Sequence, residues 1–443
     1  MEQQNNKFYN LEEFKQFDKT GLTHLNLDLS QCYNLKDNID ILSNQLSQCS
    51  QIETLILDFE GQYLKDIDLI TLIQDLPQFV SLSTLQINLI QNRIHKKGAA
   101  VLGQFLTKCL KLSNIKLDFY LNCTNSNVFT ELIEAIGSLK GVQQLEIMLG
   151  NNETKDDITF PLSKTLCNLS NQLTTLIIGL SENQIGFEGG NQIGIAISNQ
   201  QNLKNLELWL YKNQIGDQGV SSIATGLAYC TQLTSLVFNL YQNEVSHVGS
   251  HQIGKGLGKC SNLQKLELYL SKNKISEKGT QSITIGLKNC TLVTSMIISF
   301  NENNVGDEGA LGIGLALASC SNILYLELWL QINEISDQGM ESLSKHLKNC
   351  IQIKSLKFNL NHNKITDEGY QILESCLQDL PKLFSLGCWL SSFEKLLKSP
   401  EIVNCRNIKV LTLNTSFCQY FEQKFYHKRK ALKIKRLVKL IIE

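Results

Sequence analysis

The sequence repeats with a period of about 30 residues, and this period limits the possible folds more than any other feature. In the stretch 201–350, five segments align without gaps, and their cysteines and glycines recur at one fixed interval. A fixed period of this size is the signature of a solenoid, in which each repeat is one unit stacked on its neighbours. The repeated positions are Cys230, Cys260, Cys290, Cys320 and Cys350, and Gly219, Gly249, Gly279, Gly309 and Gly339.

The repeat frame extends from this stretch towards both ends of the chain. It begins at Leu22 and continues for thirteen coils at the same interval, except that the step between Val142 and Leu173 is longer by one residue. A degenerate fourteenth coil begins at Ile408, within NIKVLTLN, after a shortened step. We therefore expect one continuous body of about 13 to 14 coils rather than several globular domains.

Each coil combines two hydrophobic periods. Leu206 and Leu208 belong to an alternating stretch with a period of two, which predicts a half-buried strand. Ile223 and Leu227 lie four residues apart in a pattern that predicts one buried face of a helix. Gly219 stands near the predicted helix entrance, where a side chain would obstruct the neighbouring coil. Each unit is therefore expected to be strand, turn and helix, with the strands stacked in parallel in an α/β fold.

An asparagine follows the predicted strand in six consecutive coils. Its amide can both donate and accept hydrogen bonds, so it can satisfy backbone groups that leave the sheet and can bridge to the next coil. We expect a structural rather than a catalytic role for this ladder. Its members are Asn213, Asn243, Asn273, Asn303, Asn333 and Asn363.

These repeats resemble the leucine-rich repeat family, specifically its ribonuclease-inhibitor-like class, which has a full helix in each repeat. The resemblance rests on segments such as LELWLYKNQIGDQG and LKFNLNHNKITDEG and covers about 390 of the 443 residues. It implies an α/β leucine-rich-repeat solenoid, a horseshoe with a parallel β-sheet on the concave face and α-helices on the convex face. Such folds usually bind other proteins on the concave face. The strand segment is two residues longer than that class normally shows, and this style looks like that of ciliate repeat proteins.

The two ends of the chain lie outside the repeats. Residues 1–21 contain Leu11, Phe14 and Phe17 at helical spacing and are expected to cap the first coil. The predicted solenoid covers residues 22–418.

Residues 419–443 form a basic C-terminal tail. It carries eight Lys or Arg residues between Lys424 and Lys439, interleaved with apolar residues that include Leu432 and Ile441. As an amphipathic helix, the tail would either cap the last coil or contact an acidic surface such as an acidic protein, calmodulin or an anionic membrane. The two roles can coexist.

Composition narrows the function classes. The formal net charge of −1 gives no field that attracts nucleic acid, and only four arginines are present. We find no apolar run long enough to span a bilayer and no signal peptide, so we expect a soluble cytoplasmic protein without cofactors. The fourteen cysteines should then stay reduced. The family style also suggests a cytoskeletal or ciliary role.

Three motifs in the repeats are better explained by structure than by chemistry. One cysteine per coil gives a row of thiols, whereas a zinc site needs four ligands that converge on a point. The segment Gly249–Lys255 fits the start of a phosphate-binding loop, but it lacks the required Ser or Thr and falls in a predicted helix. His247 and His251 lie four residues apart without the glutamate of a zinc protease. We expect no metal site and no catalytic residue.

The outward strand positions carry more information, because alternate coils differ and the full period is therefore two coils. Glutamates recur at one position of alternate coils, and large side chains follow two residues later, with small residues in the coils between. Crowding on a concave face explains this alternation, and so does a protein-recognition strip, since Trp and Tyr dominate binding hot spots. Asp28, Asp58 and Asp118 would make the N-terminal end of the row acidic. The candidate protein-binding residues are Glu146, Glu207, Trp209, Tyr211, Glu267, Tyr269, Glu327, Trp329 and Trp389.

The function that these observations favour is a non-enzymatic scaffold that binds a protein partner on the concave face. The partner is expected to carry a basic or mixed patch that meets the glutamates. The alternative is a GTPase-activating protein that resembles the Ran GTPase activator, which uses this fold. That family typically has an acidic tail, whereas the tail here is basic, and no motif transfers residue by residue.

Overall fold

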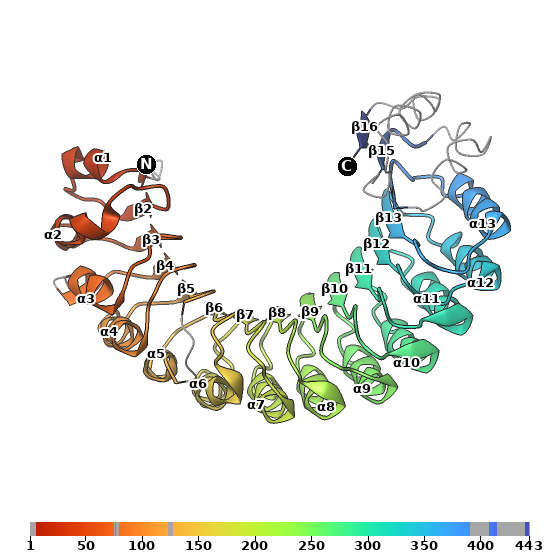
Figure 1. Ribbon diagram of the computed structural model, residues 1–443, viewed down its shortest axis with the longest axis horizontal. Helices are drawn as coiled ribbons and strands as arrows, with labels where there is room; N and C mark the ends of the chain where they lie inside the picture. The colour runs from red at the N-terminus through yellow and green to blue at the C-terminus, as the bar shows by residue number, and fades with distance from the viewer. Residues whose placement is uncertain are drawn as a thin grey trace. The chain divides into compact units, whose positions relative to one another are not determined.

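The chain forms two compact units, Met1–Ile215 and Gly216–Glu443, and each is described here by itself. The computed structural model describes residues 6–74, 76, 79–122, 127–389, 407–413 and 439–442. In each unit the strands form a parallel sheet, and the helices cover one side of it (Figure 1). We call the uncovered side the strand face and the covered side the helix face.

In the first unit the strands pair in chain order, each parallel to the next. Thr54 lies opposite Thr84, and the step lengthens by one residue between Gln144 and Thr175, as the sequence predicts. The strands are β1 (Asn6–Phe8), β2 (His24–Asp28), β3 (Thr54–Asp58), β4 (Thr84–Asn88), β5 (Asn114–Asp118), β6 (Gln144–Met148), β7 (Thr175–Gly179) and β8 (Asn205–Trp209). The helices are α1 (Leu11–Gln16), α2 (Ile39–Ser47), α3 (Asp66–Gln74), α4 (Lys96–Leu106), α5 (Thr130–Ile136), α6 (Thr159–Asn168) and α7 (Phe187–Ser198), with short 3₁₀ turns at Leu35–Asn38 and Lys155–Ile158.

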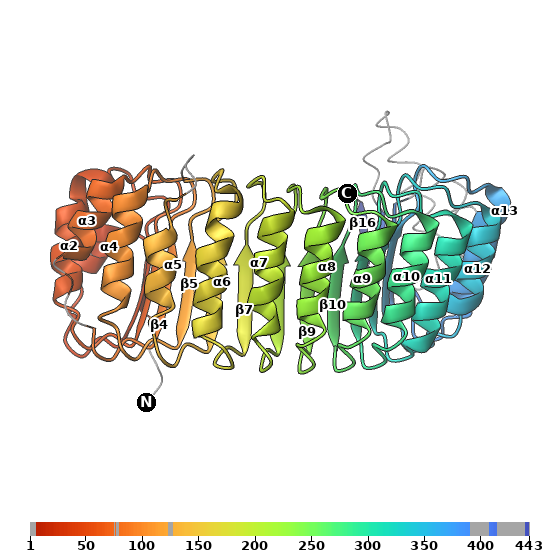
Figure 2. The same cartoon turned by 90° about the horizontal axis from the view of Figure 1, so that it is seen from below.

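The second unit repeats this plan. Its strands are β9 (Ser235–Asn239), β10 (Lys265–Tyr269), β11 (Ser295–Ser299), β12 (Tyr325–Trp329), β13 (Ser355–Asn359), β14 (Ser385–Trp389), β15 (Val410–Leu413) and β16 (Lys439–Ile442). Each is parallel to the next. Its helices are α8 (Gly216–Leu227), α9 (His247–Leu257), α10 (Ser276–Leu287), α11 (Gly306–Ser319), α12 (Asp337–Leu347) and α13 (Asp367–Gln378). Figure 2 shows the helices of this unit side by side.

The core lies between each sheet and its helices. Leu206 and Leu208 of β8 are fully buried, whereas Glu207 and Trp209 on the other side of the same strand are only partly covered. Ile223 and Leu227 of α8 are also fully buried. The predicted strand–turn–helix coil and the α/β solenoid are confirmed.

The asparagine after each strand ties two coils together, and Asn333 illustrates the contacts. Its Nδ2 donates to the carbonyl of Phe300 in the preceding coil at 2.9 Å and to that of Leu330 in its own coil at 3.0 Å. Its Oδ1 accepts from the backbone N–H groups of Asn303 at 3.1 Å and Val305 at 3.0 Å. The same kind of bonding extends the ladder beyond the six predicted positions, to Asn92, Asn122, Asn152 and Asn183 of the first unit.

On the helix side, an aspartate of one coil binds the helix start of the next coil. The Asp217 carboxylate accepts hydrogen bonds from the backbone N–H groups of Ser246 at 2.7 Å and Gly249 at 3.0 Å, and from the Ser246 hydroxyl at 2.5 Å. A Cβ at Gly249 would lie 2.6 Å from Oδ1 of Asp217, which explains the repeated glycine. Such carboxylates satisfy free N–H groups at a helix N-terminus. Similar contacts join Asp66 to His95, Asp156 to Gly186, Asp307 to Gly339 and Asp337 to Gly369.

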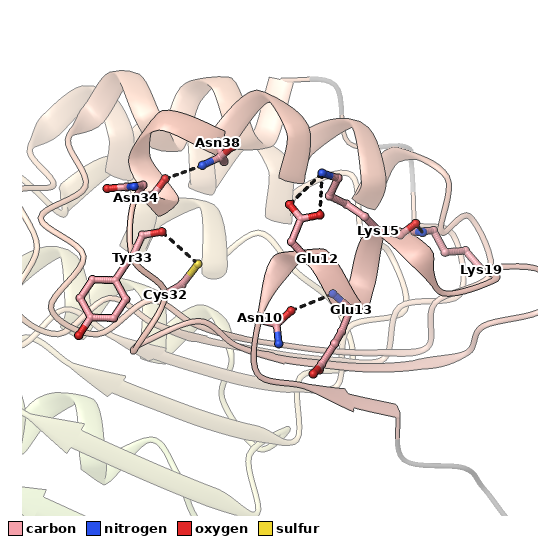
Figure 3. Close-up of polar contacts among 9 residues, drawn as sticks. All are labelled: Asn10, Glu12, Glu13, Lys15, Lys19, Cys32, Tyr33, Asn34 and Asn38. Carbon is pink, nitrogen blue, oxygen red and sulfur yellow. Dashed lines mark hydrogen bonds and ion pairs between the residues drawn. The ribbon is translucent and has the colours of Figure 1, made fainter.

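The N-terminal segment contains the predicted helix and also a strand that the sequence did not reveal. Asn10 caps α1 by accepting from the backbone N–H of Glu13 at 2.8 Å, and Lys15 contacts Glu12 at 2.9 Å (Figure 3). Leu11 and Phe14 of α1 are buried. Before this helix, β1 extends the sheet by pairing with β2.

The C-terminal segment departs from the expected helix at its last residues. The strand predicted within NIKVLTLN is β15, and Ile408 just before it is fully buried. Lys439–Ile442 forms β16, parallel to β15, so a helix that runs to Ile441 is wrong for these residues. The remainder of the predicted basic tail lies outside the described residues.

Candidate protein-binding surface

In the second unit, large and small side chains alternate along the strand face. Tyr269 ends β10 and Trp329 ends β12, and Ser299 of β11 lies opposite both in the sheet register. Ser299 is 7% exposed although it points away from the core, because an aromatic side chain stands on each side of it. Asn359 of β13 is 5% exposed next to Trp329. Tyr269 and Trp329 are themselves half-buried, so the row is a packed surface rather than a set of freely exposed rings.

The glutamates of this unit already have partners within the chain. Glu267 accepts a hydrogen bond from the Tyr269 hydroxyl at 2.8 Å and lies 2.8 Å from the Lys265 ammonium group. Burial and the Glu267 carboxylate raise the pKa of Tyr269, which therefore stays protonated as a donor. Glu327 lies 2.8 Å from the ammonium group of Lys357 on the neighbouring strand. The surface therefore presents paired charges, which favours a partner with a mixed rather than a purely basic patch.

The first unit holds the same kind of pair on β8. The Trp209 indole N–H donates to the Glu207 carboxylate at 2.9 Å. Gly179 of β7 lies opposite Trp209 in the register, and a Cβ there would collide with the side chain of Met148. A large residue on β6 therefore requires the glycine on β7. This part of the strand face therefore shows both the crowded side chains and the hydrogen-bonded Trp–Glu pair.

Glu146 and Tyr211 of the predicted site have different surroundings. The Glu146 carboxylate lies 2.9 Å from the ammonium group of Lys116. Tyr211 belongs to a second cluster, in which the hydroxyl of Tyr120 reaches across two coils to donate to Glu182 at 3.1 Å. Burial raises the pKa of Tyr120 to about 12, and Tyr211 and Glu182 add to the effect.

Sequence reasoning missed Tyr120 and Glu182 because they lie 62 residues apart and occupy different positions of the repeat. Glu182 also pairs with Lys212 at 3.1 Å. Gly150 could have indicated the cluster, since a Cβ there would lie 2.8 Å from the ring of Tyr120. The small residue allows the tyrosine to lie across its coil.

Trp389, the last predicted site residue, ends β14 opposite Asn359 in the sheet register. Its backbone therefore continues the row formed by Tyr269 and Trp329. The side chain of Trp389 lies outside the described residues.

The predicted acidic row at the N-terminal end is partly neutralised. Asp28 lies 3.3 Å from the ammonium group of Lys7. Burial raises the pKa of Asp118 to about 6, and the nearby carboxylate of Glu146 adds to the shift. Asp118 is therefore partly protonated in mildly acidic solution.

The motifs assigned to structural roles occupy positions that suit those roles. Cys230 and Cys260 are buried, and burial raises their pKa values to about 12 and about 11, so neither is a ready thiolate. The segment Gly249–Lys255 lies inside α9, not between a strand and a helix, and His247 and His251 are exposed on that helix. Within the described part of the chain, His, Cys, Asp and Glu side chains form no group of three that could hold a metal ion.

A family model described as "Leucine Rich repeat" matches residues 354–371, within the repeat frame that the strands and helices follow. The chain has a leucine-rich-repeat fold. Leucine-rich-repeat folds commonly serve as scaffolds for protein interaction, on the extended surface that stacked repeats provide.

Among solved structures, the crystal structure of the TLR13–ssRNA13 complex is similar over 93% of this chain and 52% of that chain, with 15% sequence identity and a TM-score of 0.42. The chain thus spans about half the length of that solved chain. A search of curated proteins finds no match. None of the helices in the described ranges has the length and apolar character needed to cross a membrane.

Proposed function

We propose that this leucine-rich-repeat chain is a non-enzymatic scaffold that binds a protein partner on its strand face. The observation that carries the proposal is the side-chain pairing on β8 and β10. In both strands an aromatic side chain donates a hydrogen bond to the glutamate two residues before it, at 2.9 Å for Trp209 and 2.8 Å for Tyr269. Two side chains of each strand are thus fixed before any partner arrives, which lowers the ordering cost of binding.

Packing around the aromatic side chains supports the same proposal. Ser299 and Asn359 are almost completely covered, so Trp329 between them is held on both flanks, and the residue itself stays partly accessible. Anchors that combine a rigid aromatic ring with a polar group typically dominate protein interfaces. We expect Trp329 in the second unit and Trp209 in the first unit to contribute most of the binding energy.

The chemistry of the partner follows from the paired charges. A purely basic partner would have to displace Lys265 from Glu267 and Lys357 from Glu327. A partner with both acidic and basic side chains can instead join these pairs without leaving a charge uncompensated. We therefore propose an apolar contact centred on Trp329, surrounded by charges of both signs.

The test uses the purified full chain as bait in an extract of its native cells. We expect Trp209→Ala together with Trp329→Ala to lose at least one partner that the wild type retains, while the exposed helix-face control Gln371→Ala keeps it. Circular dichroism shows that each variant is folded. If the folded double variant retains every partner, the strand face is not the interface.

A GTP hydrolysis assay separates the scaffold from the GTPase-activating alternative. The scaffold proposal predicts no change in the hydrolysis rate of GTPases purified from the same extract. Stimulation by catalytic amounts of the chain would overturn the non-enzymatic assignment.

A further inference from the structure

Helix α11 differs from the other helices of the second unit because it is apolar on its outer side as well as on its core side. Its sequence, GDEGALGIGLALAS, contains two outward leucines, Leu311 and Leu315, which are only partly covered. They lie four residues apart and so share one face of the helix. A helix that is apolar all round normally has a buried outer face, whereas both outward leucines here keep part of their surface accessible.

The apolar surface continues onto α10 and is bounded by charge on both sides. Four equivalent positions of neighbouring helices, each one coil apart, hold Lys255 on α9, Ile285 on α10, Leu315 on α11 and Lys345 on α12. Ile285 is 65% exposed. Figure 2 shows these four helices in a row. We call Ile285, Leu311 and Leu315 the outer apolar patch.

Lysines frame the patch without acidic partners. Lys255 and Lys345 are exposed, and Lys288, which directly follows the last residue of α10, is partly exposed. Among the described residues, no carboxylate forms an ion pair with any of the three. Lysines near helix C-termini are compatible with the helix dipole, but this requirement does not explain why they border an apolar patch.

We propose that the outer apolar patch binds an acidic amphipathic helix of a partner protein, lying across α9 to α12. Neighbouring helices pack at about 8 to 10 Å, so the row from Lys255 to Lys345 spans roughly 25 to 30 Å. At 1.5 Å per residue this length corresponds to a helix of about 17 to 20 residues. Its central apolar side chains would contact Ile285 and Leu315, and acidic side chains towards its two ends would meet Lys255 and Lys345.

Charge argues against two other occupants of the patch. A second copy of the chain would place lysines against lysines. An anionic membrane would meet Glu308 and Glu341, which are exposed towards the N-terminal ends of α11 and α12. A helix that lies along the row of lysines covers a narrower strip, with Glu341 about one helical turn from Lys345 and Glu308 about two turns from Leu315. The proposal concerns the helix face and is independent of the strand-face function.

The probe is a fluorescent synthetic peptide of about 20 residues, with leucines on one face of its centre and glutamates at both ends. Its matched control has the same composition, with the glutamates at the centre and the leucines at the ends. In fluorescence anisotropy with the full chain, we expect the first peptide to bind at least about tenfold more tightly than the control. Equal affinity for the two peptides would overturn the proposal.

Variants locate the binding on the patch. Ile285→Gln with Leu315→Gln should weaken binding of the first peptide by at least about tenfold, and so should Lys255→Glu with Lys345→Glu. Circular dichroism confirms that each variant is folded, and the exposed Ile285→Gln change alone provides a milder variant. Retained affinity in all of the folded variants would overturn the proposal.

Further measurements exclude the other occupants and separate this proposal from the strand-face function. Trp329→Ala should leave peptide binding unchanged, so loss of one interaction does not imply loss of the other. Binding of the wild type to phosphatidylserine vesicles that is lost in Ile285→Gln with Leu315→Gln would reassign the patch to a membrane. Self-association in sedimentation equilibrium that is lost in the same variant would reassign it to a second copy.

Discussion

Replacement of Asn333 by alanine should destabilise the second unit strongly, because one amide satisfies backbone groups of two coils. Its loss removes the acceptor of the N–H groups of Asn303 and Val305 and a donor to the carbonyls of Phe300 and Leu330. A buried polar group left without a partner costs about 1–3 kcal/mol. Water that enters the vacated space can form hydrogen bonds with some of these backbone groups. We therefore expect the free energy of unfolding to fall by about 3–5 kcal/mol.

The measurement combines urea unfolding, followed by circular dichroism, with amide hydrogen exchange. Repeat proteins can unfold in parts, so exchange is needed to locate the loss. The amides of Asn303 and Val305 should exchange faster in Asn333→Ala. The matched control is Asn349→Ala, which makes the same substitution at an exposed asparagine outside the ladder. It should change the free energy of unfolding by less than about 0.5 kcal/mol. The reasoning fails if the two variants have the same stability or if exchange at Asn303 and Val305 is unchanged.

Two further predictions concern single polar groups. Asp118→Asn should stabilise the fold by about 1–2 kcal/mol at neutral pH, because burial raises the folded-state pKa of Asp118 to about 6 and ionisation is therefore unfavourable. The wild type gains stability as the pH falls from about 6 towards the ordinary aspartate pKa of 3.8. Urea unfolding at several pH values should show that Asp118→Asn has lost this pH dependence. An unchanged pH dependence would contradict the raised pKa of Asp118. Asn88 makes the equivalent turn with an amide, which shows that asparagine fits there. Thr154→Val should raise the free energy of unfolding by about 1 kcal/mol, because the buried Thr154 hydroxyl has no hydrogen-bond partner among the described residues. A lower free energy of unfolding in urea titration would contradict this reason.

The repeat could be predicted from sequence because each coil is specified locally and many times. Leu206 and Leu208 show the strand period, and Ile223 with Leu227 shows the helix period, so errors in one coil are corrected by the others. The insertion between Val142 and Leu173 was visible as a break in the same frame. The cysteines and glycines that reveal the period are buried, so they cannot contact a partner.

The candidate surface could be predicted only as a list of positions. Its contacts depend on rotamers, and nothing in the sequence shows that Trp209 donates to Glu207 or that Tyr120 reaches Glu182 across two coils. The strands at the two ends, β1 and β16, were missed because they are short and outside the repeat frame, and only their pairing with a neighbouring strand defines them. The repeated glycine was assigned to a close approach between coils, but the aspartate that makes this approach was not identified.

The most direct test of the central claim is site-specific photo-cross-linking in native cells. A benzoylphenylalanine is placed at Tyr325, which is 52% exposed on the strand face, or at Gln371, which is exposed on α13 of the helix face. The account predicts a cross-linked protein partner at Tyr325 that is reduced by Trp329→Ala and absent at Gln371. A partner that cross-links at Gln371 and never at Tyr325 would contradict the assignment of the strand face as the binding surface.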